Sequence, residues 1–149
     1  MDNNPKVSII IPHYNNYNII KDCLESIKNL TFENFETIVV DNASSDNSFK
    51  HIKDNHSDIN LIKSKYNRGY AGGCNYGAEF AKGEYLLFLN NDTEQEANFI
   101  EPLVDFLDKN SNVCSVQPKI KNFYKKNNFD YAGASGGFID YLAFPFCRG

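Results

Sequence analysis

Polar side chains that suit a divalent cation follow an apolar run in the middle of the chain. Residues 86–89 are Leu-Leu-Phe-Leu, and Asn90, Asn91 and Asp92 come directly after them. A short, continuously apolar run is typical of a parallel strand buried on both faces. Ligands bind beyond the carboxyl ends of such strands, where a carboxylate among neutral oxygen donors suits a cation shared with a diphosphate. Alternatively, Asp92 caps the next helix and binds no cation.

Two other predicted strands, residues 7–11 and 36–40, also end in polar residues. A tyrosine ring and amides suit a base or a ribose, and a carboxylate can accept a strong hydrogen bond from a pyrimidine N3–H or a ribose hydroxyl. Tyr14 could instead be ordinary packing, and Asp41 could be a helix cap. Three polar strand ends on one edge of a sheet nevertheless favour a ligand site. The candidates in these two loops are Pro12, Tyr14, Asn15, Asp41, Asn42 and Ser44.

A glycine-rich segment, residues 67–77, precedes the apolar run. Gly69, Gly72 and Gly73 would let the backbone approach a ligand closely and would supply N–H groups at the start of a helix. The alternative is a tight turn followed by a helix packed closely on the sheet.

The composition is that of an ordinary globular protein with one domain. The chain has 149 residues, 42% of them hydrophobic and 23% charged, and its net charge is -4. This acidity argues against a nucleic-acid partner, which would require a basic face. The chain starts without the pattern of a signal peptide, and no apolar stretch is long enough to cross a bilayer. We therefore expect a cytoplasmic protein.

The cysteines and histidines show no metal-ligand spacing. No two cysteines form a CxxC pair, so we expect buried thiols in a reducing cytosol rather than a zinc site or disulfides. One histidine, His13, lies in the loop after the first predicted strand. The residues concerned are Cys23, Cys74, Cys114, Cys147, His13, His51 and His56.

Predicted strands and helices alternate along the chain. Short β-branched or apolar runs predict the strands, and apolar residues at helical spacing predict the helices. Ser and Asp at residues 44–46 could cap the second helix, and Gly83 could follow the end of the third. Such alternation predicts βαβ units in a mostly parallel sheet. The expected strands are residues 7–11, 36–40, 60–64, 86–89 and 113–116, and the expected helices include residues 20–30, 49–52, 67–81 and 99–107.

Four other enzyme classes lack their motif or the context that the motif needs. A dinucleotide-binding domain needs G-x-G-x-x-G after the first strand, where this chain has Pro12, His13 and Tyr14. The P-loop sequence is also absent, and the one G-x-S-x-G match, residues 133–137, does not follow a predicted strand, as the nucleophile motif requires. A nucleotidyltransferase would share the metal chemistry, but it would need a glycine-rich basic loop at residues 12–16.

Four motifs, in order, resemble the opening of family 2 glycosyltransferases. The first two are VSIIIPHYN at residues 7–15 and IVVDNASSD at residues 38–46. NRGYAGGCN at residues 67–75 and FLNND at residues 88–92 are similar to the rhamnosyltransferase-type branch of that family. The resemblance implies a GT-A fold, a sugar-nucleotide donor and, for most members, inversion at the anomeric carbon with Mg²⁺ or Mn²⁺.

Carried over by position, the resemblance assigns a base-binding carboxylate, Asp41, and a metal ligand, Asp92. Asp92 stands where the family keeps its DxD signature. Asn90 and Asn91 replace the acidic partners, so the cation should bind weakly before the donor arrives. The implied donor-binding set is Pro12, Tyr14, Asn15, Asp41, Asn42, Ser44, Asn67, Gly69, Gly72, Asn75, Asn90 and Asn91.

The general base that the family carries is not evident in the sequence. An inverting transfer needs a carboxylate within hydrogen-bond reach of the acceptor hydroxyl. Residues 141–149 contain no Asp or Glu, and Asp130 and Asp140 are possible substitutes, although both have the character of structural or acceptor-side residues. The chain therefore resembles the donor-binding part of a longer enzyme.

We expect an α/β fold, namely a GT-A, Rossmann-like three-layer sandwich with a mostly parallel central sheet, truncated at its C-terminus. Residues 1–120 would form the nucleotide-binding core, and residues 121–149 would begin the acceptor-side segment. The last segment is rich in aromatic residues that would pack on the missing portion, which predicts self-association. These aromatic residues are Tyr131, Phe138, Tyr141, Phe144 and Phe146.

The expected activity is transfer of a sugar, such as rhamnose, from a UDP- or dTDP-sugar to a glycan or lipid-linked acceptor. The reaction would be inverting and metal-assisted, in the cytoplasm or at the inner face of the membrane. The alternative is a non-catalytic nucleotide-sugar-binding or interaction module with the same fold.

Overall fold

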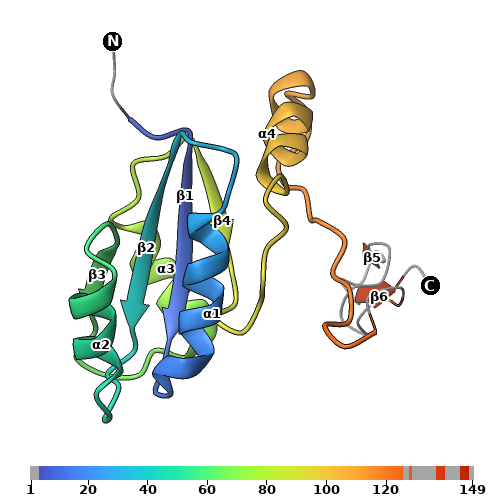
Figure 1. Cartoon of the computed structure of the whole chain (residues 1–149). Coiled ribbons are helices and arrows are strands. Elements are labelled where there is room, and N and C mark those ends of the chain that lie inside the picture. Colours follow the sequence, from blue (N-terminus) through green and yellow to red (C-terminus); the bar gives the residue numbers. More distant parts are fainter. Residues whose placement is uncertain (1–3, 126–127, 129–136, 140–144, 148–149) are drawn as a thin grey trace. The chain divides into compact units, whose positions relative to one another are not determined.

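Two long apolar strands form the centre of the sheet in a computed structural model of the chain (Figure 1). β1 (Val7–His13) and β2 (Phe35–Asp41) are rich in isoleucine and valine, whose branched side chains favour the extended backbone. Every residue of β1 is buried, as expected for a strand covered on both faces. The structure describes residues 4–125, 128, 137–139 and 145–147.

The first of two compact units, residues 1–99, contains a four-stranded parallel sheet. β3 (Asn60–Lys63) and β4 (Tyr85–Phe88) lie at its two ends, in the order β3-β2-β1-β4. The chain thus moves from β1 to β3 in one direction and then returns to place β4 on the other side of β1. The strand order reverses between β1 and β4, which is the point where open α/β sheets bind their ligands.

Three helices cover the two faces of this sheet. α1 (Tyr17–Lys28) and α2 (Ser48–Asn55) connect strands that advance in one direction, and α3 (Gly69–Ala78) connects strands that return. Right-handed crossovers therefore place α3 on the face opposite to α1 and α2. Figure 1 shows α1 and α3 on opposite sides of the strands. This arrangement confirms the expected α/β fold with a parallel central sheet.

α3 approaches the sheet closely because a glycine lies at the contact. Ile10, Ile38 and Val40 form a buried cluster, and Tyr76 of α3 packs against it. A Cβ atom at Gly77 would lie 2.5 Å from Cγ2 of Ile10, so a larger residue would push the helix away. On α1, the expected helical spacing is confirmed by four buried residues, Ile20, Cys23, Leu24 and Ile27.

The second unit, residues 100–149, begins with α4 (Ile100–Lys109). β5 (Gly137–Ile139) and β6 (Pro145–Cys147) pair as antiparallel strands in the same unit. Each described helix of the chain is too short or too polar to cross a lipid bilayer. The aromatic residues that predict self-association have side chains outside the described part of the structure.

The fifth strand expected at residues 113–116 is wrong. This segment is neither strand nor helix, and the N–H of Val113 donates to the carbonyl oxygen of Asn110 in a turn that follows α4. Two valines in a run of four favour an extended backbone, but a strand also needs a neighbour to pair with. Cys114 is exposed, which corrects the expectation of a buried thiol, whereas Cys23 and Cys74 are buried as expected.

β4 differs from the strand buried on both faces that its apolar run predicts. Leu86 is 44% exposed and Phe88 is 45% exposed, because β4 is the end strand of the described sheet. β1 in turn continues through Pro12, where the sequence predicts its end. β4 pairs with β1 only as far as Ile10, so the absent N–H of Pro12 removes no bond from that ladder.

The predicted end of the third helix is wrong, whereas Asp46, one of the expected capping residues, does bond to the start of the second helix. α3 ends at Ala78, and Gly83 lies beyond it, where its N–H donates to Oγ of Ser8 at 2.8 Å. A Cβ at Gly83 would lie 2.5 Å from the backbone nitrogen of Ser8, so close packing rather than a helix cap requires this glycine. α2 starts at Ser48, whose N–H donates to Oδ1 of Asp46 at 2.9 Å.

The junction of α1 and α2 contains a buried histidine. Oη of Tyr17, the first residue of α1, lies 3.2 Å from Nε2 of His56, which is 3% exposed. Nδ1 of His56 is buried and has no partner in the described structure. Burial lowers the pKa of His56 below 6.5, Lys28 lowers it further, and Glu25 and Asp58 oppose them.

We expect this histidine to make the protein less stable in acid. The unfolded chain takes up a proton on His56 near pH 6.5, whereas the folded chain does so only at a lower pH. The free energy of unfolding should therefore fall as the pH drops below about 6.5. Urea denaturation between about pH 8 and about pH 5 measures the slope.

The matched variants for this test are His56→Gln and His51→Gln, the second at an exposed position. His56→Gln should flatten the slope only partly. Burial also lowers the pKa of His13, so His13 contributes to the same slope and remains in the variant. His51→Gln controls for the loss of a histidine ring that stacks on Tyr17. Equal slopes in the wild type and in His56→Gln would contradict this account.

Candidate functional site

The loops that follow β1 and β2 are joined by reciprocal hydrogen bonds. The N–H of Asn15 donates to Oγ of Ser44 at 2.9 Å, and Oδ1 of Asn15 accepts from the N–H of Ser45 at 2.9 Å. The N–H of Asn16 donates to Oδ2 of Asp46 at 2.7 Å. Sequence reasoning selected Asn15 and Ser44 but not Asn16 or Asp46, because their pairing depends on the strand order. The two loops therefore form one wall at the carboxyl edge of the sheet.

Part of this wall has an unfavourable backbone conformation. Asn15, Asn16 and Ala43 have φ angles of 56°, 62° and 62°. Asparagine adopts this left-handed region comparatively easily, but alanine at Ala43 costs roughly 1–2 kcal/mol there. Such strain persists only where surrounding contacts impose it, and it clusters at functional sites.

Asp41 lies at the end of β2 with its carboxylate completely buried. Oδ2 accepts a hydrogen bond from the N–H of Ser44 at 3.3 Å, and Oδ1 has no partner in the described structure. Burying a carboxylate oxygen without a hydrogen-bond donor costs free energy. A ligand donor that reaches this oxygen would therefore stabilise the complex. This oxygen is therefore a candidate acceptor for a ligand N–H or O–H.

Asn42 ties the ends of β1 and β2 to the start of α3. Its backbone N–H donates to the carbonyl oxygen of His13 at 2.7 Å. Its side chain donates from Nδ2 to the carbonyl oxygen of Gly69 at 3.2 Å and accepts from the N–H of Arg68 at 3.4 Å. A Cβ at Gly73 would lie 2.8 Å from Nδ2 of Asn42, so this glycine makes room for the amide. Asn42 is thus a buried connector of the site.

Arg68 is a cation of this region that sequence reasoning did not select. Its guanidinium carbon lies 4.1 Å from the ring centre of Tyr76 and 4.6 Å from that of Tyr66. Nε donates to Oγ of Ser64 at 3.1 Å. Cation–π contacts with two rings hold the arginine beside the ends of β2 and β3. Tyr66 precedes Arg68 in the sequence and Tyr76 follows it, and only the folded chain brings both rings to the arginine.

Asn91 after β4 bonds to the end of β1. Nδ2 of Asn91 lies 3.0 Å from Nδ1 of His13, which is 1% exposed. Burial lowers the pKa of His13, and the negative charges of Asp41 and Asp46 oppose that effect. The His13 ring thus stands between the base-binding candidate of β2 and the metal-binding candidates after β4.

Asp92 is exposed and makes no hydrogen bond or ion pair in the described structure. Partial burial raises the pKa of Tyr70 to about 12, and Cys74 and the negative charge of Asp92 raise it as well. Because Tyr70 is in the first turn of α3, the carboxylate of Asp92 is near the start of that helix. A phosphate group at the helix start, which favours anions, could share a cation with Asp92.

The residues present fit a cation held jointly with a diphosphate. Among the described residues, no group of three or more His, Cys, Asp or Glu side chains could hold a metal alone. One exposed carboxylate, Asp92, stands beside two amides, Asn90 and Asn91. Mg²⁺ is usually bound by one or two carboxylates together with substrate phosphates and water. Such a set should bind the cation weakly until the nucleotide is present.

The remaining candidates have differing positions. Tyr14 is 49% exposed, so its ring face is accessible, whereas Pro12 is buried against Gly73. Oδ1 of Asn67 accepts from the N–H of Gly69, whose φ of 67° suits glycine. Asn75 is exposed on α3 and no hydrogen bond connects it to the other candidates in the described residues. The backbone carbonyl oxygen of Asn90 accepts a hydrogen bond from Sγ of Cys23. Gly72 lies close to Arg68, because a Cβ at Gly72 would be 2.9 Å from Cβ of Arg68.

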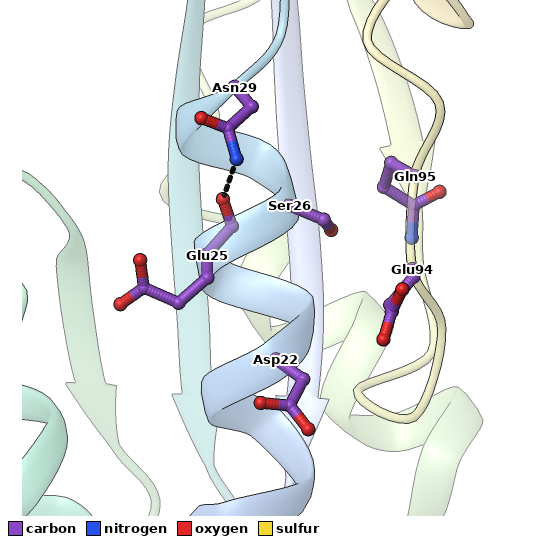
Figure 2. A pocket seen from close by; sticks show the side chains of 6 residues that line it. All are labelled: Asp22, Glu25, Ser26, Asn29, Glu94 and Gln95. Carbon is purple, nitrogen blue, oxygen red and sulfur yellow. Dashed lines mark hydrogen bonds between the residues drawn. The ribbon is translucent and has the colours of Figure 1, made fainter.

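An open hollow of about 360 Å³ lies elsewhere in this unit, between α1 and the segment after Asp92 (Figure 2). In Figure 2, Asp22 and Ser26 point across it towards Glu94 and Gln95. Its acidic lining suits neither a nucleotide nor a diphosphate. We therefore place the candidate site at the strand ends, where unpartnered and bonded polar groups converge. The hollow is lined by Asp22, Glu25, Ser26, Asn29, Glu94 and Gln95.

Comparison with known proteins identifies the family of the chain. The family model described as "Glycosyl transferase family 2" matches residues 8–143. The chain belongs to glycosyltransferase family 2. Membership accounts for the four ordered motifs and for the parallel sheet that carries them.

Two curated relatives are similar in sequence to this family 2 chain. It is 36% identical over 106 residues to UDP-Glc:alpha-D-GlcNAc-diphosphoundecaprenol beta-1,3-glucosyltransferase WfgD of Escherichia coli, covering 70% of this chain and 42% of the relative. It is 29% identical over 141 residues to glycosyltransferase GlyG of Streptococcus pneumoniae, covering 91% and 43%. The chain therefore spans about two fifths of the length of these relatives.

Two solved structures share the fold of this glycosyltransferase chain. S. aureus TarS 1–349 in complex with UDP-GlcNAc has a TM-score of 0.63 and 26% identity, covering 77% of this chain and 38% of TarS. The mannosyltransferase PcManGT of Pyrobaculum calidifontis in complex with GDP-Man and Mn²⁺ has a TM-score of 0.63 and 25% identity, covering 78% and 34%. The GT-A-like α/β fold expected from the sequence is confirmed.

Proposed function

We propose that the chain binds a UDP- or dTDP-sugar together with Mg²⁺ or Mn²⁺ and forms the donor-binding part of a glycosyltransferase. One observation carries the proposal. The unpartnered buried oxygen of Asp41 and the exposed carboxylate of Asp92 follow strands on either side of β1, at the edge where the strand order reverses. Two fold neighbours were solved with UDP-GlcNAc and with GDP-Man and Mn²⁺, which supports this ligand class.

Each side chain has a distinct role in this proposal. Oδ1 of Asp41 accepts a hydrogen bond from the N3–H of the pyrimidine, and the exposed ring of Tyr14 stacks on the base. N–H groups at the start of α3 face the diphosphate, and Asp92 holds the cation between itself and the phosphate oxygens. The bound cation offsets the charge that develops on the leaving diphosphate.

The acceptor and the stereochemistry are the finer part of the proposal. The acceptor hydroxyl attacks the anomeric carbon with inversion, and its general base lies outside residues 1–149. A lipid-linked or glycan acceptor fits the name of the WfgD relative, which refers to a diphosphoundecaprenol. Such an acceptor would bring the protein to the inner face of the membrane. The transferred sugar, including rhamnose, stays a prediction from the motifs.

A second candidate function is a non-catalytic nucleotide-sugar-binding module with the same fold. Asn90 and Asn91, which replace carboxylates of the family signature, favour it. Incubation of the chain with UDP-sugars and a panel of acceptors separates the two. Transfer, or metal-dependent hydrolysis of the donor, would exclude the module, whereas binding without either would favour it for this chain.

We expect Asp41→Asn to lower the affinity for UDP at least about tenfold without lowering the melting temperature. The asparagine keeps an oxygen for the N–H of Ser44, and it removes a buried charge that has an unpartnered oxygen. A residue retained only for stability would behave in the opposite way. Isothermal titration calorimetry with UDP, dTDP and GDP measures binding, and a thermal melt measures stability.

Asp46→Asn is the matched control for this experiment. Asp46 is an exposed carboxylate of the same loop, and an asparagine there can still accept one of its hydrogen bonds. It should change the affinity for UDP much less than Asp41→Asn. If the wild-type chain is folded and binds none of the three nucleotides, the proposed function is wrong.

A further inference from the structure

Three polar residues from neighbouring strands form a row along the carboxyl edge of the sheet. Asp41 ends β2, His13 ends β1, and Asn91 follows β4, and the strand order is β2-β1-β4. His13 and Asp41 are paired in the register of β1 and β2, so their side chains leave the same face of the sheet. His13 is the middle member, and it connects the base-binding candidate to the metal-binding candidates.

The hydrogen bond between His13 and Asn91 determines which groups donate and accept. The carboxamide nitrogen Nδ2 of Asn91 carries two protons and can only donate. In this arrangement Nδ1 of His13, 3.0 Å away, accepts the hydrogen bond, and the ring carries its proton on Nε2. Nε2 is buried without a partner in the described structure.

This bond also decides how the carboxamide of Asn91 is turned. An asparagine side chain can present either its oxygen or its NH₂ group to a site, and only the oxygen can bind a cation. Because Nδ2 is engaged by His13, Oδ1 is the group left for other partners. Asn91 is adjacent to Asp92 in the chain, so this oxygen is the candidate second ligand for a cation held by Asp92.

We propose that His13 is a positioning residue, which turns the carboxamide of Asn91 so that its oxygen joins Asp92 as a ligand of the cation. This inference rests on the proposed function. It explains how a site with one carboxylate in place of several can still bind Mg²⁺ or Mn²⁺. Residues that orient metal ligands typically change metal affinity by about 10- to 100-fold when they are removed.

The tautomer of His13 is the first test, and it needs no substitution. Long-range ¹H–¹⁵N correlation NMR of the wild-type chain distinguishes a proton on Nε2 from one on Nδ1. We expect the proton on Nε2 at about pH 8, where a histidine is neutral. A proton on Nδ1 would mean that His13 donates to the oxygen of Asn91, and the proposal would be overturned.

Binding of Mn²⁺ in the presence of saturating UDP is the second test, measured by electron paramagnetic resonance of free Mn²⁺. His13→Phe keeps a ring but accepts no hydrogen bond, and it should lower the affinity for Mn²⁺ about tenfold. His13→Gln offers an amide oxygen to Nδ2 of Asn91 and should retain most of the affinity. Affinity for UDP without metal should fall less than affinity for Mn²⁺ in both variants.

The substitution Asn91→Asp provides a rescue test, which would fail if His13 had only a structural role. Either oxygen of a carboxylate can bind a cation, so its orientation no longer matters. The double variant His13→Phe with Asn91→Asp should therefore bind Mn²⁺ at least as tightly as the wild type. Failure of this rescue, or undiminished Mn²⁺ affinity in His13→Phe, would overturn the positioning role while leaving UDP binding intact. Absence of UDP binding by the wild type would instead overturn the proposed function.

Discussion

Asp92→Asn is expected to lower the affinity for UDP in the presence of Mn²⁺ roughly 100-fold. Asp92 is the one carboxylate of the Asn-Asn-Asp run after β4, and it has no protein partner in the described structure. Loss of a residue that only supports a ligand costs about 10- to 100-fold in metal affinity, and loss of the charged ligand should reach the upper end. Without metal, the affinity of the variant for UDP should be no lower than that of the wild type. Isothermal titration calorimetry with and without Mn²⁺ measures both values.

Glu94→Gln is the matched control for Asp92→Asn. Glu94 is an exposed carboxylate two residues further along the same segment, and it lines the open hollow of Figure 2. We expect this variant to bind UDP with Mn²⁺ as the wild type does. Equal losses of UDP affinity in both variants would indicate a general effect of negative charge near the site. Metal binding by the carboxylate of Asp92 would then be excluded.

Ile10→Ala is expected to lower the free energy of unfolding by about 2–5 kcal/mol. Ile10 is completely buried in the middle of β1, and a Cβ at Gly77 of α3 would nearly touch it. The helix cannot collapse far into the resulting cavity, because it is tied to the sheet edge through Asn42 and Gly69. For a domain stabilised by about 5–15 kcal/mol, this loss is large. Urea denaturation followed by circular dichroism measures it.

Ile19→Ala removes the same number of atoms from the surface of α1. Ile19 is 42% exposed, and surface substitutions usually change stability by less than about 0.5 kcal/mol. The difference between the two variants therefore reports the packing of α3 on β1. Losses of similar size would show that α3 does not cover this face of the sheet in solution.

The local patterns of the sequence predicted most elements of the first unit. Apolar spacing identified α1 through Ile20, Cys23, Leu24 and Ile27, and the β-branched runs identified β1 and β2. These patterns are reliable because one strand or helix must place its own apolar side chains on a buried face. The same criterion was wrong at residues 113–116, since a strand also depends on a neighbour that no local pattern reveals.

Motif spacing predicted which strand ends carry the candidate site, but it did not predict how their side chains interact. Exposure of β4 at Leu86 and Phe88 differs from the apolar run, because burial depends on what lies beside a strand. Arg68 was missed because its two tyrosine partners meet only in the folded chain. Gly83 suggested a helix end, whereas its role is close contact with the backbone of Ser8.

The sequence alone determined the α/β class, the family and the residues that lie at the ends of the strands. These properties follow from periodicity and short motifs, which are local along the chain. Only the tertiary structure decided that Asp41 is buried with one unpartnered oxygen and that His13 bonds to Asn91, 78 residues away. The physical reason is that strand order and register bring distant residues together, and both are properties of the packed sheet rather than of any segment.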